Sequence, residues 1–279
     1  MSDKQFLELG KKIIEEGVWV NNERTGTKCL TVIGHTMTYD VGAGEVPLLN
    51  TKQSFPVSAV AEIIGYLRKY TNAQQFADIG AKTWFVNANE TVAWLNNPNR
   101  KGENDMGKVY GAAQCEGELE KVYNNLKQGI DDRGETLSFW NPDKFSEGCL
   151  RPCMRFHTFS ILGNTLHLTS ESRSVDYACG LNFNSIQCYF LLLFMARITG
   201  LKPGKVTHHL INVHIYEEHL DNVKLQLSRK VDSSFETRMY LENWVTCLED
   251  VTLSNMHARE YIKVVDYTHQ GKLDFKLIS

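Results

Sequence analysis

Cys153 carries a thiol that could act as a nucleophile. Arg151 and Arg155 flank it in the sequence, and nearby cations favour the reactive thiolate because they lower the pKa of the thiol. A free cysteine is more often a buried core residue, and the chain has 7 cysteines. Cys153 alone is therefore a weak signal, and its weight depends on the polar residues that follow it.

Polar side chains suited to a phosphate, a ring amide and a sugar come after Cys153. Arg173-Ser174 places a guanidinium beside a hydroxyl, and both are good phosphate ligands. Asn184 has a donor and an acceptor on one amide, which matches the edge of a uracil ring, although it also fits the N-cap of a helix beginning at Ser185. His214 and Tyr216 are two positions apart on a predicted strand, so they point to one face and could hold a sugar hydroxyl.

Each of these residues has an ordinary structural explanation when taken alone: a surface ion pair, a helix cap, or a satisfied pair in a sheet. Glu62 is harder to explain in this way, because it lies in an apolar segment beside Ile63 and Ile64. A carboxyl in such a place is costly unless it is hydrogen-bonded or has a raised pKa. Buried carboxyls of this kind often transfer protons, so Glu62 joins the candidates.

Size and composition limit the class of protein. The chain has 279 residues, 42% apolar content and a net charge of -3, which is enough for a large core and gives no electrostatic footprint for nucleic acid. No apolar run reaches the 18 residues of a membrane span, and the N-terminus lacks the pattern of a signal peptide. The cysteines form no CxxC pair, so a reduced, cytoplasmic protein without a metal site is expected.

Hydrophobic periodicity predicts one α+β domain over residues 1–279, with several antiparallel strands. Gly163-Asn164 is a plausible hairpin turn, and residues 73–104, with two tryptophans, are typical of a ligand-facing insertion. Residues 21–27 are predicted to form a loop, and the part of the chain after residue 228 is predicted to contain one strand. Helices are predicted at 4–16, 56–67, 117–128, 185–199 and 217–227, and strands at 30–39, 136–140, 155–162, 165–172, 205–216 and 260–266.

An ordered series of short motifs resembles the thymidylate synthase family, which includes the phage deoxynucleotide hydroxymethylases. The resemblance covers the chain from about Arg24 to the C-terminus. It implies a mixed sheet that forms the interface of a homodimer, with helices packed around it. The motifs are Arg24-Thr25-Gly26-Thr27, Pro47-Leu48, Thr51-Lys52, Glu62, Trp84, Val109-Tyr110-Gly111, Pro152-Cys153, Arg173-Ser174, Asp176, Gly180, Phe183-Asn184 and His214-Ile215-Tyr216.

The resemblance implies a role for each motif. Cys153 would add to carbon 6 of a pyrimidine nucleoside monophosphate, and methylene-tetrahydrofolate would supply a one-carbon unit to carbon 5. Glu62 would manage protons, and Tyr110 would assist proton removal from carbon 5. Asn184 would read the base. The other implied contacts are Arg24, Arg173, Ser174 and the partner chain's Arg133 for the phosphate, His214 and Tyr216 for the sugar, and Trp84, Asn87 and Asp176 for the folate.

The chain also departs from the family pattern. Met154 stands where a His usually follows the catalytic Cys, and Gly134 replaces the second Arg of a pair. The segment 84–87 lacks an Asp and a second Trp, and the C-terminal tail lacks the small apolar ending that closes the synthase site. The remaining departures are Asn182 for Pro and Ser172 for Gln.

The altered folate wall favours attack by water on the methylene intermediate, because the wall normally excludes water. The sequence therefore predicts a deoxyuridylate hydroxymethylase. A thymidylate synthase is the close alternative, and cytidylate or ribonucleotide substrates are further ones. A non-catalytic nucleotide- or RNA-binding module would not need Cys153. A Cys-His hydrolase would need a histidine beside Cys153, and the candidates are His157, His167, His208, His209 and His214.

Overall fold

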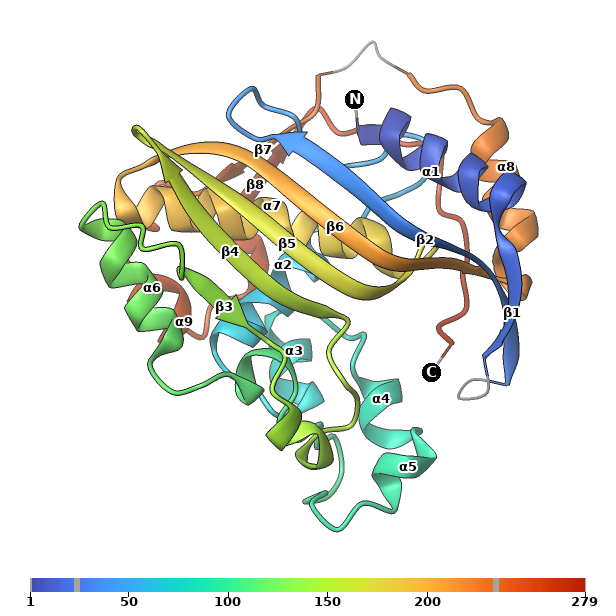
Figure 1. Ribbon diagram of the computed structural model, residues 1–279, viewed down its shortest axis with the longest axis horizontal. Coiled ribbons are helices and arrows are strands. Elements are labelled where there is room, and N and C mark those ends of the chain that lie inside the picture. The colour runs from blue at the N-terminus through green and yellow to red at the C-terminus, as the bar shows by residue number, and fades with distance from the viewer. Residues whose placement is uncertain (1, 23–25, 233–235, 279) are drawn as a thin grey trace.

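The structure is a computed structural model that describes residues 2–22, 26–232 and 236–278. Its main sheet has the strand order β1-β2-β6-β5-β4-β3, and the long strands run diagonally across the molecule (Figure 1). Neighbouring strands are antiparallel except β5 and β6, which are parallel, so the sheet is mixed and the α+β prediction is confirmed. The strands are β1 (Val18–Asn22), β2 (Thr27–Asp40), β3 (Thr136–Ser138), β4 (Met154–Leu162), β5 (Thr165–Asp176) and β6 (Lys202–Tyr216).

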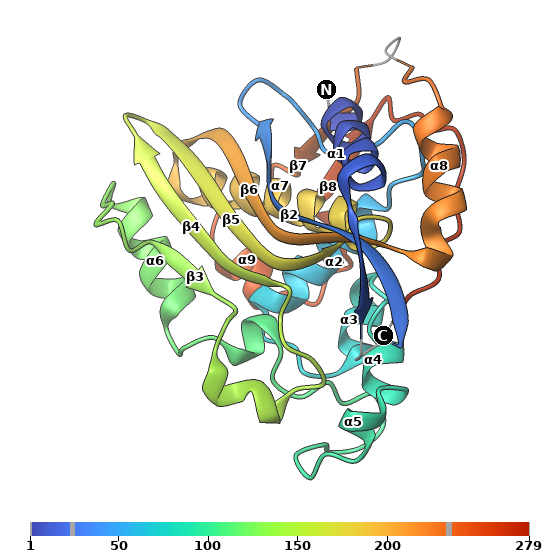
Figure 2. The same ribbon diagram turned by 45° about the vertical axis from the view of Figure 1, so that its right-hand side comes forward.

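Helices pack on one face of this sheet. Both views place α7 (Gly180–Thr199) and α2 (Pro56–Leu67) behind the strands (Figures 1 and 2). α7 is long and apolar enough to cross a membrane, but 78% of its apolar window is buried inside the protein, as in the core helix of a globular fold. The predicted central helix is therefore confirmed, and it joins one buried cluster that extends from Phe6 to Ile262.

The start of α7 differs from the prediction. The helix begins at Gly180 rather than Ser185, so Asn184 lies in its second turn and is not the N-cap. The first turn is stable because Leu181 is buried and the Asn182 amide donates to the carbonyl of Pro47 at 2.8 Å. Asn182 thus gains a partner that its own neighbourhood in the sequence does not reveal.

The remaining predicted elements lie close to their expected positions. β4 and β5 form the predicted hairpin, in which Leu162 pairs with Thr165 and Gly163 has a positive φ of 61°. The other helices are α1 (Ser2–Glu16), α3 (Ala73–Ile79), α4 (Phe85–Asn89), α5 (Val92–Leu95), α6 (Glu118–Lys127), α8 (Leu220–Ser228) and α9 (Glu249–Thr252), with 3-10 turns η1 (Tyr110–Ala113), η2 (Pro142–Glu147), η3 (Glu217–His219) and η4 (Ala258–Glu260).

Two predictions were wrong. Asn21 and Asn22, expected in a loop, end strand β1, where they pair with Lys28 and Thr27 of β2. The C-terminal part holds two strands rather than one, because β7 (Arg238–Leu241) pairs with β8 (Ile262–Val265). In both cases the pairing partner supplies the backbone hydrogen bonds that make a polar or short segment a strand. Arg24 and Thr25 lie outside the described residues.

Candidate active site

Cys153 lies in the turn immediately before β4 and is half-buried. Its amide donates to the Tyr110 hydroxyl at 3.1 Å, and its carbonyl accepts from the Arg173 amide at 2.9 Å. The Arg173 guanidinium donates to the carbonyls of Pro152 and Arg151, both at 2.9 Å. Arg173 is therefore the cation held beside the predicted nucleophile.

Arg155 does not take the role that its position in the sequence suggested. Its guanidinium pairs with Glu171 on the neighbouring strand β5, and Nε lies 2.8 Å from Oε1. The carboxylate offsets the charge of Arg155, so this residue contributes little to a positive field at Cys153. Arg155 also lies over the ring of Trp140, 5.5 Å from its centroid.

Tyr110 occupies a sparsely populated backbone conformation, with a positive φ of 49°. Its ring stacks on Tyr66 with centroids 4.3 Å apart and planes at 5°. The next residue must be a glycine, Gly111, because a β-carbon there would lie 1.8 Å from the Tyr66 carbonyl oxygen. Burial raises the pKa of Tyr110 well above its usual range. A non-glycine residue held at positive φ by its surroundings is common at functional sites, and here it fixes a neutral phenol against Cys153.

Glu62 lies inside α2 and is buried, as the sequence indicated. Its carboxyl accepts from the hydroxyl of Thr83, from Gln187 Nε2 at 2.8 Å and from the Tyr66 hydroxyl at 3.4 Å. Burial raises the pKa of Glu62, and these three hydrogen bonds oppose the rise. The carboxyl can therefore exist with or without its proton in a closed environment, which suits proton transfer.

Gln187 joins Glu62 to Asn184. It is fully buried in α7, and its Oε1 accepts from Asn184 Nδ2 at 3.2 Å. Gln187 was not among the site residues predicted from the sequence. The signal that could have found it is its spacing of three residues from Asn184, which places both side chains on one face of a helix.

Arg173, Ser174 and His214 line a cavity of about 510 Å³. Strands β1, β2, β5 and β6 form its walls, and the lining also includes Asn22 and Asn212. His214 Nδ1 lies 2.9 Å from Asn212 Oδ1, and the His214 and Tyr216 rings meet edge to face with centroids 5.1 Å apart. The structure thus brings together Arg173, Ser174, His214 and Tyr216 from the residues predicted to hold a phosphate and a sugar, with a positive guanidinium at the wall.

The three residues predicted to contact the folate lie on two elements, α4 and β5. Trp84 is buried at the start of α4, with its ring edge to face against Tyr110 at 5.8 Å, and Asn87 follows in α4. The indole Nε1 of Trp84 has no hydrogen-bond partner among the described residues. A buried donor without a partner is costly, so a polar group of a ligand would suit this position.

Asp176, the third predicted folate contact, ends β5. Its Oδ1 accepts from the amides of Ala178 at 2.8 Å and Cys179 at 3.3 Å, and lies 3.7 Å from His219 Nδ1. Burial alone would raise the pKa of the Asp176 carboxyl, but His219 holds it below its usual value. Asp176 is therefore ionised near neutral pH and can accept from a ligand.

The C-terminal tail packs beside Asp176. The carbonyl of Lys276 lies 2.8 Å from His219 Nε2, and the ring of Phe275 lies under the Lys52 ammonium at 5.0 Å. Burial lowers the pKa of Lys52 to about 8. The tail thus covers the end of β5 although it lacks the ending typical of the family.

The histidines that a Cys-His hydrolase would need are bonded to groups other than Cys153. Burial lowers the pKa of His157 to about 4 and of His208 to about 3, so both are neutral. The observed partners are Ser170 for His157, the Lys205 amide for His167, Ser172 for His208, Thr36 for His209 and Asn212 for His214.

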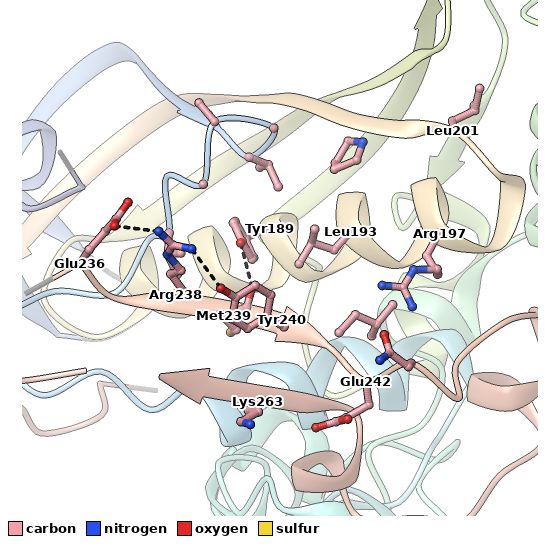
Figure 3. Close-up of a pocket in the computed structure, with 18 residues that line it drawn as sticks. Tyr189, Leu193, Arg197, Leu201, Glu236, Arg238, Met239, Tyr240, Glu242 and Lys263 are labelled. Atoms are coloured by element: carbon pink, nitrogen blue, oxygen red, sulfur yellow. Dashed lines mark hydrogen bonds and ion pairs between the residues drawn. The ribbon is translucent and has the colours of Figure 1, made fainter. Parts of the chain in front are cut away.

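A second cavity, of about 720 Å³, lies between α7 and the paired strands β7 and β8 (Figure 3), and Cys153 is not among its lining residues. Arg238 pairs there with Glu236 at 2.8 Å, and the Tyr189 hydroxyl donates to the Met239 carbonyl at 3.1 Å. Part of its polar lining is therefore already satisfied within the chain.

Arg133 is exposed in the turn before β3 and has a positive φ of 68°. Its amide donates to Asp131 Oδ1 at 2.9 Å, and its guanidinium has no hydrogen-bond or ion-pair partner among residues 2–22, 26–232 and 236–278. The side chain is therefore available to a group outside this chain.

The fold and the residues gathered around Cys153 are those of a transferase of one-carbon groups. The family model described as thymidylate synthase matches residues 4–279, and the chain belongs to this family. Enzymes of the family use methylene-tetrahydrofolate as a co-substrate and require no metal.

Similar proteins match over nearly their whole length. A "Thymidylate synthase" of Idiomarina loihiensis is 50% identical, over 93% of this chain and 98% of the relative. A "Thymidylate synthase" of Pseudoalteromonas translucida is 49% identical over the same shares. A third, of Photobacterium profundum, is 46% identical over 98% of both chains.

Proposed function

We propose that this protein converts dUMP to dTMP with methylene-tetrahydrofolate, as a single catalytic domain over residues 1–279. The observation that carries the proposal is one connected set of contacts that runs from Cys153 through Tyr110 and Glu62 to Asn184. The chain is 46–50% identical to proteins named thymidylate synthase. The thymidylate synthase interpretation has more support than the hydroxymethylase interpretation expected from the altered folate wall. The relatives are bacterial, and they give no support to a role in phage DNA modification.

The nucleotide would lie with its phosphate at Arg173 and Ser174 and its sugar at His214 and Tyr216. Arg24, which is outside the described residues, would add a further phosphate contact. Asn184 Oδ1 would accept from N3–H of uracil, and Nδ2 would donate to O4. The cavity of about 510 Å³ beside Arg173 supports this placement.

Cys153 would act as the nucleophile. Its sulfur would form a bond to carbon 6 of the ring, and the electron pair displaced from the 5,6 double bond would make carbon 5 nucleophilic. Asn184 would stabilise the charge that develops on O4, because a preorganised donor there strengthens as the charge grows. Methylene-tetrahydrofolate would supply the one-carbon unit and the hydride when bound.

Tyr110 and Glu62 would handle the protons. Tyr110 accepts from the Cys153 amide and keeps its own hydrogen to orient a water that removes the proton from carbon 5. When that proton leaves, the electron pair left at carbon 5 would break the bond between the one-carbon unit and the folate nitrogen. After hydride reaches the one-carbon unit, the 5,6 double bond would re-form as the bond between carbon 6 and the Cys153 sulfur breaks. Glu62, with its raised pKa, would exchange protons with an ordered water during these steps. Trp84, Asn87 and Asp176 would hold the folate.

The active form would be a homodimer, with Arg133 reaching the phosphate of the partner's site. The uncovered face of the main sheet, which carries exposed Ile33 and Ile211, supports pairing through that face (Figure 1). A cytoplasmic location is supported by the cysteines, each of which carries a thiol rather than a disulfide.

Incubation with dUMP and methylene-tetrahydrofolate tests the proposal. We expect dTMP and dihydrofolate in equal amounts. If 5-hydroxymethyl-dUMP and tetrahydrofolate form, the hydroxymethylase reading replaces the synthase. If the enzyme is active on cytidylate or on UMP instead, the substrate assignment is wrong.

A further inference from the structure

Gln187 links two residues that act on different parts of the substrate in the proposed function. Its side chain is fully buried, and its two ends make different contacts. Nε2 donates to Glu62 Oε2 at 2.8 Å, and Oε1 accepts from Asn184 Nδ2 at 3.2 Å. Both polar ends of the amide are therefore satisfied within the protein.

The carboxylate sets the direction of this chain of hydrogen bonds. In its ionised form the Glu62 carboxylate can only accept, and it already accepts from Thr83 and Tyr66. Gln187 must therefore turn its amide nitrogen to Glu62 and its oxygen to Asn184. Asn184 must in turn present its amide nitrogen to Gln187, which fixes the orientation of the Asn184 amide before any ligand binds.

We propose that Gln187 is a positioning residue that sets the preference of Asn184 for uracil over cytosine. The proposal rests on the proposed function. In the fixed orientation, Asn184 offers Oδ1 to N3–H and one Nδ2 hydrogen to O4 of uracil. Cytosine has an acceptor at N3 and an amino group at position 4, so it needs the Asn184 amide to rotate by half a turn.

The relay makes that rotation unfavourable. A rotated Asn184 would place Oδ1 against Gln187 Oε1, so two acceptors would face each other. A rotated Gln187 would only move the mismatch to the carboxylate of Glu62. A ligand that leaves a buried polar group without a partner binds much more weakly, and a hydrogen-bonding site rejects a close analogue in this way.

Gln187→Met tests the proposal, because methionine has a similar length and cannot form the relay. The dissociation constants of dUMP and dCMP are measured by calorimetry on the full-length protein without folate. The preference for dUMP should fall about tenfold or more, the scale of one lost buried hydrogen bond. Gln187→Leu is made alongside, so that the comparison does not depend on one variant folding.

Gln187→Glu provides the conservative control. A protonated Glu at this position would donate its hydroxyl to Glu62 and present its other oxygen to Asn184, so the direction of that hydrogen bond and the preference for dUMP should survive. Ser185→Ala is the matched control on the same helix, since Ser185 bonds Tyr39 and the Leu181 carbonyl. It should lower the melting temperature without moving the dUMP to dCMP ratio.

The possible outcomes distinguish a failure of the proposed function from a failure of the positioning role of Gln187. If the wild-type protein binds neither nucleotide, the proposed function fails. If the wild-type prefers dUMP and Gln187→Met keeps that preference while losing thermal stability, Gln187 is only structural and the inference is overturned. An equal loss of preference in Gln187→Met and Gln187→Glu would also contradict it.

Discussion

Glu62, Gln187 and Asn184 are bonded to one another inside the protein, whereas Arg173 and His214 face an open cavity of about 510 Å³. In the first region, each fully buried amide or carboxyl group has partners from the same chain. In the second, the walls are strands, and Arg173, whose guanidinium donates to two backbone carbonyls, also lines the open space. The closed region fixes orientation before a ligand arrives, and the open region supplies charge once the ligand is there.

This difference predicts that substitutions in the closed region change catalysis and selectivity, and that substitutions in the open cavity change affinity. Cys153 lies between the two regions, because its amide meets Tyr110 and its carbonyl meets Arg173. It is therefore the residue whose loss should have the largest effect on rate.

Cys153→Ser should lower kcat by about four to six orders of magnitude, the scale for loss of an enzyme nucleophile. The dissociation constant of dUMP should change only a few-fold, because the groups that bind the nucleotide are kept. Single-turnover kinetics and calorimetry measure the two effects. Cys149→Ser, at a nearby buried thiol, is the matched control and should keep its activity. Comparable losses in both variants would argue against a nucleophilic role for Cys153.

Glu62→Gln should lower kcat by about 10²–10⁴, the usual contribution of general acid–base catalysis. The same substitution should increase, not decrease, the free energy of unfolding. Because burial raises the folded-state pKa of Glu62 above the ordinary value of 4.5, the wild-type protein loses stability as pH rises through that folded-state pKa. The glutamine side chain does not ionise, so the variant should gain stability relative to wild-type above about pH 4.5.

Denaturant titrations at several pH values measure this gain. A variant that loses stability relative to wild-type as pH rises would show that Glu62 is stabilised as a carboxylate, and the proton-transfer role would lose its physical basis. Thr83→Val removes one of the hydrogen bonds to the same carboxyl and should raise the pKa of Glu62 further.

The sequence predicts the open cavity better than the closed network. The predicted strand 165–172 ends immediately before Arg173 and Ser174, and strand periodicity predicts that His214 and Tyr216 share a face. Arg173, Ser174 and His214 line the open cavity in the structure. The network depends on contacts between α2, α7 and the turn at Tyr110. Such contacts join residues more than 100 positions apart, such as Glu62 and Gln187, and no local pattern encodes them.

Smaller errors have the same origin. The start of α7 was missed because the partner that stabilises Asn182 is the distant Pro47 carbonyl. Arg155 was assigned to Cys153 because it is close in sequence, whereas it lies at a shift in the β4–β5 register and its side chain pairs with Glu171. Resemblance to a family nominated the candidate site residues, but the register and the side-chain partners needed the structure.

Arg173→Lys should weaken dUMP binding by about 10- to 100-fold, the range for losing a charge-assisted hydrogen bond. Lysine cannot hold the Pro152 and Arg151 carbonyls while also presenting a planar donor to a phosphate. Arg155→Lys is the matched control, since Arg155 also lies 5.5 Å from the Trp140 ring but pairs with Glu171. The control should change the dissociation constant by less than about twofold, the range of an exposed ion pair.

Arg133→Ala should have the smallest effect, about a tenfold rise in KM for dUMP, because one solvent-accessible phosphate contact is lost. Because this phosphate contact would come from the partner chain, two different inactive or weakened variants should complement each other in a mixed dimer. Mixing inactive Cys153→Ser dimers with Arg133→Ala dimers, after subunit exchange, should therefore restore a low KM. In such a mixed dimer, the subunit that keeps Cys153 receives Arg133 from its partner. If the KM of the mixture stays at the value of Arg133→Ala alone, Arg133 serves its own chain or none, and the cavity is completed in another way.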